Sequence, residues 1–124
     1  MKTELPRNAG FIISELNGAL SRDTVTLHGG FTGATFLKPG AVLGKLTSGG
    51  KYVISPASGS DGSQTAVAVL AHYADISDGD VQAAVINFGA EVIGDALIFD
   101  SSVDQDSEIA TKKTQLAAVY IKAR

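Results

Sequence analysis

Two histidines are the only imidazoles available for acid–base or metal chemistry in this chain, which has no cysteine. His28 ends an alternating stretch that begins at Thr24, and His72 follows an apolar stretch that begins at Ala66. Zinc sites and catalytic triads need further ligands or a base, and neither histidine has such a partner nearby in the sequence. The lack of cysteine excludes thiol catalysis, disulfides and cysteine-based zinc sites. We therefore interpret both histidines as ordinary surface or strand-end residues and expect no bound metal.

An acidic cluster at residues 75–80, Asp-Ile-Ser-Asp-Gly-Asp, has the oxygen density of a calcium-binding loop. An EF-hand loop that began at Asp75 would need glycine at its sixth position and glutamate at its twelfth. Those two positions hold Asp80 and Ile86. The cluster is therefore interpreted as a solvated turn between two strands rather than as a cation site.

Two glycine–lysine segments, Gly44–Leu46 and Gly50–Tyr52, are the nearest approach to a phosphate-binding loop. Each lacks the serine or threonine of a P-loop, and neither leads into a predicted helix. No serine lies in the Gly-x-Ser-x-Gly elbow of a hydrolase. A pair of carboxylates that acts as in a glycosidase stays open as an alternative. The Asp and Glu residues cluster at predicted turns, however, where their contribution to solubility accounts for them. The sequence thus predicts a protein that is not an enzyme and that has no cofactor and no small-molecule substrate.

The overall charge and hydropathy exclude two further classes of partner. The net charge is −3 and the isoelectric point is near 5.2, whereas a nucleic-acid partner calls for a basic face. The longest apolar run, residues 66–71, is far shorter than a membrane span. The first ten residues contain no apolar segment of a signal peptide. We therefore expect no nucleic acid, no membrane, and synthesis in the cytoplasm.

Short strands separated by tight turns are the elements that this sequence predicts. Glycine occurs 14 times against 3 prolines, and turn residues recur every eight to twelve positions. A type II turn is predicted at Lys38–Ala41, with proline second and glycine third, and a hairpin turn at Thr47–Gly50. Residues 55–63 are predicted to form a loop. The predicted strands span residues 11–15, 24–28, 41–46, 51–54, 65–72, 81–88 and 91–99.

A helix is predicted near the C-terminus, where Asp104–Ser107 supplies candidate N-cap residues. Glu108 and Lys112 are spaced for a helical ion pair, and Lys113 falls on the apolar side. The residues expected on that apolar face are Ile109, Leu116, Ala117 and Tyr120. Alternatively, residues 119–122 leave the helix as a closing strand. The chain is thus predicted to be mostly β with one short C-terminal helix.

The length of 124 residues fits one domain. Residues 1–10 are polar, contain Pro6 and have no apolar periodicity, so we expect a flexible N-terminal arm. Residues 11–124 are then the single folded domain.

Three segments in order give the chain a family resemblance. They are Asp61-Gly-Ser-Gln-Thr-Ala-Val-Ala-Val-Leu70, Gly89-Ala-Glu-Val-x-x-x-Ala-Leu-Ile98 and Asp106-Ser-Glu-x-x-x-Lys-Lys113. Together they resemble the bacteriophage lambda-type head decoration protein family, and the likeness runs from about Phe11 to Lys122.

The resemblance implies a small α+β domain with a β-rich, barrel-like core. It also implies a structural role in the virion, in which a homotrimer binds the major capsid protein on the outside of the expanded phage head at threefold sites. There it stabilises the head against internal DNA pressure. The family further implies that the arm takes part in capsid attachment, although the arm is shorter here than in the lambda protein. The capsid-binding residues expected on this basis are Lys2, Thr3, Glu4, Leu5, Pro6 and Arg7.

Two alternatives remain at this stage. Pro39–Lys45 resembles a turn–strand unit of biotinyl and lipoyl carrier domains, which would make the chain a small non-catalytic β-barrel binding or carrier module. Carriers display their lysine between Asp or Met residues at a hairpin tip, and no such tripeptide occurs here. A host-binding adhesin would need an exposed aromatic patch, which 5 Phe, 3 Tyr and no Trp supply poorly.

Overall fold

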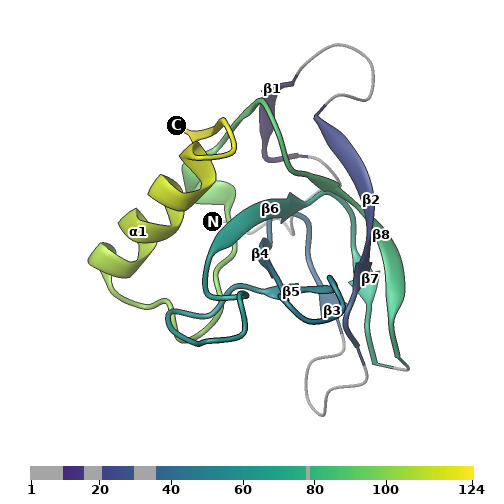
Figure 1. Cartoon of the computed structure of the whole chain (residues 1–124). Coiled ribbons are helices and arrows are strands. Elements are labelled where there is room, and N and C mark those ends of the chain that lie inside the picture. Colours follow the sequence, from purple (N-terminus) through teal and green to yellow (C-terminus); the bar gives the residue numbers. More distant parts are fainter. Residues whose placement is uncertain (1–9, 16–20, 30–35, 78) are drawn as a thin grey trace, which may run out of the picture.

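The fold is described from a computed structural model, which covers residues 10–15, 21–29, 36–77 and 79–124 (Figure 1). The strands are β1 (Ile12–Glu15), β2 (Arg22–Leu27), β3 (Phe36–Leu37), β4 (Val42–Lys45), β5 (Tyr52–Ile54), β6 (Ala66–Leu70), β7 (Ala74–Asp75), β8 (Val81–Ile86), β9 (Ala90–Val92) and β10 (Ile121–Ala123). A 3₁₀ helix, η1, spans Gly94–Ala96, and the α-helix α1 spans Asp106–Ala117.

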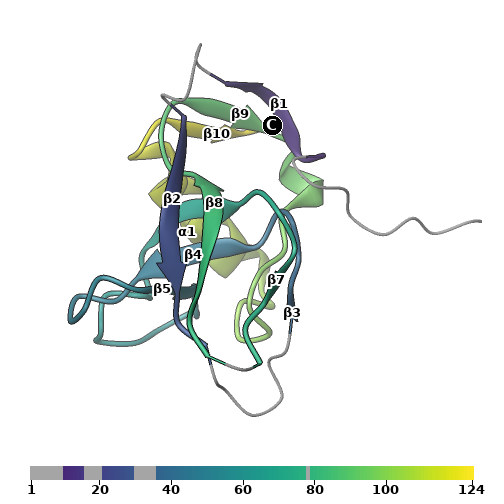
Figure 2. The same cartoon turned by 90° about the vertical axis from the view of Figure 1, so that its right-hand side faces the viewer.

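Five strands close into a barrel in the order β2-β5-β4-β6-β8. A second sheet, in the order β1-β9-β10, lies across one end of the barrel, and β3 and β7 form a separate ribbon (Figure 2). Helix α1 packs beside β6 and leads back to β10 (Figure 1). The predicted fold class, a mostly β, barrel-like domain with one short C-terminal helix, is confirmed.

The turn chemistry that the sequence predicted shapes the barrel. In the turn before β4, the Ala41 N–H donates to the Lys38 carbonyl at 3.1 Å, and Gly40 has a φ of +98°. Strands β4 and β5 pair antiparallel as the predicted hairpin, with Leu43 opposite Ile54. Gly49, with a φ of +86°, lies in the tip of this hairpin. These positive φ values are accessible to glycine at little cost, which explains the residue types.

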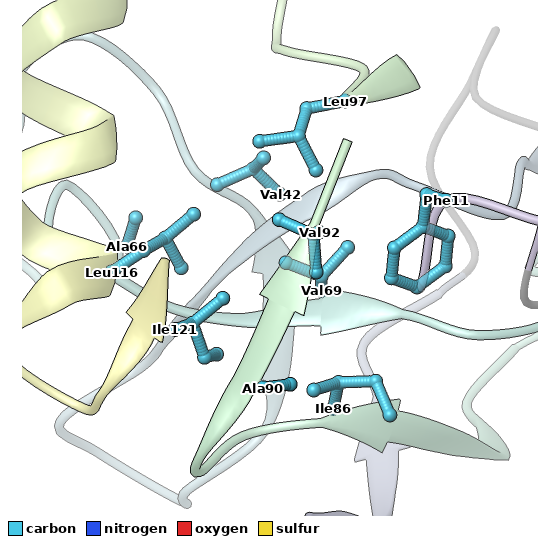
Figure 3. Close-up of a cluster of buried hydrophobic side chains, with 10 residues drawn as sticks. All are labelled: Phe11, Val42, Ala66, Val69, Ile86, Ala90, Val92, Leu97, Leu116 and Ile121. Atoms are coloured by element: carbon cyan, nitrogen blue, oxygen red, sulfur yellow. The ribbon is translucent and has the colours of Figure 1, made fainter. Parts of the chain in front are cut away.

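Strands β4 and β6 are apolar without alternation because side chains on both of their faces are buried. In β4, Val42 contributes to one hydrophobic cluster and Leu43 to another. The first cluster lies between the barrel, the β1-β9-β10 sheet and the helix, and Figure 3 shows how its side chains converge. It contains Phe11, Val42, Ala66, Val69, Ile86, Ala90, Val92, Leu97, Leu116 and Ile121. The second cluster contains Leu27, Ala41, Leu43, Ala68, Leu70, Ala74, Ile76 and Val85.

The predicted helix face is correct in part. Leu116 is fully buried, but Ala117 is exposed and Tyr120 is 70% exposed. Tyr120 is exposed because the helix ends at Ala117 and the chain reverses at Tyr120, whose φ is +64°. Ala117 is still helical, but the buried side chains of the helix are Lys112 and Leu116, and Ala117 lies outside that face. The alternative, a closing strand after the helix, is confirmed by β10, which pairs with β9 in parallel.

The predicted roles of the helical lysines and of Glu108 also need correction. Lys112, only 2% exposed, lies on the buried face, whereas Lys113 is half-buried. The Glu108 carboxylate accepts the Gln105 N–H at 3.1 Å and thereby caps the helix, with Gln105 as the N-cap. Lys112 instead donates to the Ser55 hydroxyl oxygen and to the carbonyl oxygens of Pro56 and Gln64. The expected Glu108–Lys112 ion pair is therefore wrong, because both groups have other hydrogen-bond partners.

The strand expected over residues 91–99 is shorter than predicted. Strand β9 ends at Val92, and η1 follows, with the Leu97 N–H donating to the Gly94 carbonyl at 3.3 Å. Ile98 then forms an isolated bridge with Ala41 of the barrel. The Gly94 N–H donates to the Arg124 carbonyl at 3.0 Å, so the last residue of the chain meets the point where the strand turns into η1.

Candidate interaction surface

Asp80 contacts residues from two distant parts of the sequence, His28 and Gly29 after β2 and Lys51 before β5. Its Oδ1 accepts the Gly29 N–H at 3.0 Å and lies 3.2 Å from His28 Nδ1, while its Oδ2 forms an ion pair with Lys51. The hydrogen bond from Lys51 is the main reason that the pKa of Asp80 falls to about 2, with the Gly29 and His28 contacts adding to the effect. We call His28, Lys51 and Asp80 the seam cluster. A cation, a histidine and a carboxylate meet here. The carboxylate of Asp80 already contacts Lys51, His28 and the Gly29 N–H.

Asp75, the other end of the acidic segment, has a local structural role. Its Oδ1 accepts the Ser77 N–H at 3.0 Å and the Ser77 hydroxyl at 2.6 Å. These hydrogen bonds lower the pKa of Asp75. Among the residues that the structure describes, no group of three or more His, Cys, Asp or Glu side chains could hold a metal ion. The described residues after Asp75 connect β7 to β8, so this part of the segment lies between two strands, where the sequence predicted a turn.

A serine–lysine contact inside the protein has the types of residue used for nucleophilic catalysis. The Lys112 Nζ donates to Ser55 Oγ at 2.9 Å. Both side chains are buried, however, and the Ser55 hydroxyl donates to the Ser63 carbonyl at 2.7 Å. Lys112 also donates to the carbonyls of Pro56 and Gln64, and burial lowers its pKa. The contact is closed to substrate and fastens the loop at residues 55–64 to the helix.

The glycine–lysine segments form the two sides of the β4–β5 hairpin rather than a phosphate cradle. The Leu46 N–H donates to the Lys51 carbonyl at 2.8 Å, which closes the hairpin beyond the strands. The loop at residues 55–64 is fastened to this hairpin as well, because the Thr47 N–H donates to the Asp61 carbonyl at 2.8 Å.

Aromatic side chains are exposed at the end of the β1-β9-β10 sheet. Phe88 and Tyr120 pack edge to face, with ring centroids 5.4 Å apart. A groove beside Tyr120 is also lined by Ser14, Glu15, Gly89, Ala90, Glu91 and Lys122. We call Phe88, Tyr120 and the residues of this groove the aromatic face. Exposed aromatic residues with charged neighbours are typical of protein–protein contact surfaces.

Ion pairs stabilise the groove of the aromatic face. Glu15 accepts three hydrogen bonds from Arg22, and Glu91 accepts one from Arg124 at 2.9 Å. Each arginine lowers the pKa of its glutamate partner, mainly through the hydrogen bond. Two of the charged residues that line the groove, Glu15 and Glu91, are therefore ion-paired.

Sequence reasoning missed the aromatic face, because residue counts do not tell which aromatic side chains are exposed. In the alternative with a closing strand over residues 119–122, Tyr120 does not belong to the buried face of the helix. The ribbon of β3 and β7 carries another exposed ring, Phe36. Figures 1 and 2 both show this ribbon well away from the β1-β9-β10 sheet.

The six residues expected to bind the capsid, 2–7, lie outside the part of the chain that the structure describes. They precede β1, which pairs with β9 at the edge of the β1-β9-β10 sheet. The described part of the chain begins at Gly10 and Phe11, which lead into β1.

The described strands form a small closed β-barrel that carries exposed aromatic rings. The family model for bacteriophage lambda head decoration protein D matches residues 1–121, so the chain belongs to this family. The family is structural, which supports a role in capsid decoration and favours a protein that is not an enzyme. A comparison with individual curated proteins gave no match. No helix within the described ranges is long and apolar enough to span a membrane.

Proposed function

We propose that the chain binds the outside of the expanded phage head at its threefold sites as a homotrimer and stabilises the head against the pressure of packaged DNA. The family match over residues 1–121 carries this proposal. Its partner is then the major capsid protein. The chain is made in the host cytoplasm and becomes part of the outer surface of the virion, with residues 11–124 as one domain and residues 1–10 as an arm.

The physical basis of stabilisation is selective binding. A ligand that binds the expanded shell and not the unexpanded or ruptured shell lowers the free energy of the expanded state. Cyclic symmetry matches a trimer to a threefold site, and simultaneous contact with several capsid subunits adds avidity. The aromatic face, at the end of the β1-β9-β10 sheet, and the arm, which precedes β1 in the sequence, are the regions that we propose for these contacts.

The fastened loop at residues 55–64 favours such a role, because rigid surfaces lose little conformational entropy on binding. The carrier alternative rested on Lys45, and carriers display their lysine at the tip of a hairpin. Lys45 lies within β4, opposite Tyr52 of β5, so this alternative gains no support.

The stabilising role is tested by heating DNA-filled heads that lack the decoration protein, with and without the purified chain. DNA release, followed by a dye that cannot enter intact heads, is expected to shift to higher temperature when the chain is present. An unchanged release temperature at saturating protein would contradict the proposed stabilisation.

Deleting residues 1–8 is expected to weaken binding to expanded heads about tenfold, which corresponds to about 1.4 kcal/mol of binding free energy. The melting temperature should stay nearly unchanged, because the deletion ends before Phe11, the first of the described residues that belongs to the buried core. Binding is measured by co-sedimentation with expanded heads, and melting by circular dichroism.

The matched control keeps the length of the arm and replaces residues 2–7 by glycine and serine. Loss of binding in both variants assigns attachment to the side chains from Lys2 to Arg7. Wild-type affinity in the deletion variant would show that the arm is a passive tail and that attachment lies on the folded part.

A further inference from the structure

The barrel is closed by a very short pairing between β2 and β5. On its other side, β2 pairs with β8 over six residues, from Arg22 opposite Ile86 to Leu27 opposite Val81. Its pairing with β5 consists of one parallel partner pair, Leu27 with Tyr52. The His28 N–H extends this pairing by donating to the Tyr52 carbonyl at 2.9 Å. The backbone hydrogen bonds between β2 and β5 thus extend over a very short length of this seam.

The seam cluster lies at this short pairing. His28 directly follows β2, Lys51 directly precedes β5, and Asp80 directly precedes β8. The Asp80 carboxylate therefore contacts the β2 side through His28 Nδ1 and the Gly29 N–H, at 3.2 and 3.0 Å, and the β5 side through Lys51. One side chain links the three strands that meet at the seam.

Close backbone contact fixes Asp80 in this position. A Cβ atom on Gly29 would lie 2.0 Å from the Gly79 carbonyl oxygen and 2.7 Å from the Ile76 carbonyl oxygen. Glycine at residue 29 thus lets the end of β2 approach the turn before β8. The approach brings the Gly29 N–H within hydrogen-bond distance of the Asp80 carboxylate.

We propose that Asp80 is a latch whose carboxylate holds the end of β2 against β5 and so keeps the barrel closed at its shortest pairing. Closure matters because an open seam exposes the backbone of β2 and β5 as two sheet edges, on which other chains can pair. The latch is a property of the folded chain and does not depend on the proposed capsid binding.

Several charged groups surround the latch. Lys51 is shared with a groove that Asp23, Lys45 and Tyr52 also line. The Asp23 carboxylate raises the pKa of Tyr52, although burial contributes more. Since the Asp80 carboxyl stays ionised down to about pH 2, the latch is engaged at neutral pH.

The latch is tested with Asp80→Asn, which keeps the shape of the side chain and removes its charge. Amide hydrogen exchange is measured by NMR at neutral pH for His28, which pairs across the seam, and for Ala71. The Ala71 N–H donates to the Ala84 carbonyl at 3.0 Å, away from the seam. Exchange at His28 is expected to accelerate about tenfold while exchange at Ala71 stays within about twofold, because only the seam opens.

The matched control is Asp75→Asn, which neutralises an acidic residue of the same segment whose carboxylate bonds with Ser77 two residues away. It is expected to leave exchange at His28 unchanged. Equal His28 rates in the two variants would overturn the proposal, as would uniform acceleration at both amides in Asp80→Asn.

If Asp80→Asn does not fold, Lys51→Met provides the decisive variant. It removes the cation on the β5 side and leaves the Asp80 contacts with His28 and Gly29. Selective acceleration at His28 supports the latch, whereas unchanged exchange at His28 rejects it.

Discussion

Replacing Lys112 by alanine is expected to lower the free energy of unfolding by about 3 kcal/mol. The Lys112 ammonium donates to Ser55 Oγ at 2.9 Å, to the Pro56 carbonyl at 2.6 Å and to the Gln64 carbonyl. Its removal leaves these oxygens without their donor in a buried place and leaves a cavity where the lysine side chain was. Urea unfolding, followed by circular dichroism, measures the change.

Two control variants separate the causes of this effect. Lys112→Met retains most of the side-chain volume and removes the donor, so a loss nearly as large is expected if the hydrogen bonds dominate. Lys113→Ala changes the neighbouring lysine, which is half-buried, and is expected to cost less than about 1 kcal/mol. Equal losses for Lys112→Ala and Lys113→Ala would contradict the fastening role of Lys112.

Replacing Gly44 by alanine is expected to cost about 3 kcal/mol, because the added methyl group has no room. A Cβ atom at residue 44 would lie 2.0 Å from the Ser63 carbonyl oxygen and 2.8 Å from the Ser63 Cα. The clash is with backbone, so a rotamer change cannot relieve it. Unfolding by urea again gives the free energy, and the β4–β6 pairing, which is irregular at Gly44, is expected to be disturbed.

Gly59→Ala is the matched control in the loop that contacts Gly44. At residue 59 a Cβ atom would have its nearest neighbour at 3.7 Å, and the φ of Gly59 is outside the left-handed region. We expect a change within about 0.5 kcal/mol. A Gly44→Ala protein as stable as Gly59→Ala would show that the loop and β4 are not in the close contact described.

The Lys112 and Gly44 variants should also couple. The Ser63 carbonyl that approaches Gly44 accepts the hydrogen bond of Ser55, and Ser55 accepts that of Lys112. Both substitutions therefore displace the same loop. The double variant is expected to lose less stability than the sum of the two single variants.

The local parts of the fold could be predicted from the sequence where residue types demand one backbone conformation. Pro39 and Gly40 defined the turn before β4, and Gly49 and Gly50 defined the hairpin. The start of the helix was predicted from the capping residues at Asp104–Ser107, and its N-cap is Gln105. In these segments the physical cause lies within a few residues of its effect, so no tertiary information was needed.

The tertiary parts could not be predicted in this way. The choice between Lys112 and Lys113 as the buried lysine depends on the loop at residues 55–64, whose carbonyl groups accept the hydrogen bonds. The seam cluster joins residues 52 positions apart, His28 and Asp80, which no spacing rule brings together. The exposure of Tyr120 depends on the chain reversal after α1. Each of these features comes from contacts between distant segments.

The proposed decoration of the expanded head by a trimer is tested by saturation binding to two forms of the shell. Labelled protein is titrated onto expanded and unexpanded phage-head shells, and the bound copies per shell are counted after sedimentation. Saturation at one trimer per threefold site is expected on expanded shells, and no saturable binding is expected on unexpanded shells. Equal binding to both forms, or saturation at a single copy per threefold site, would contradict it.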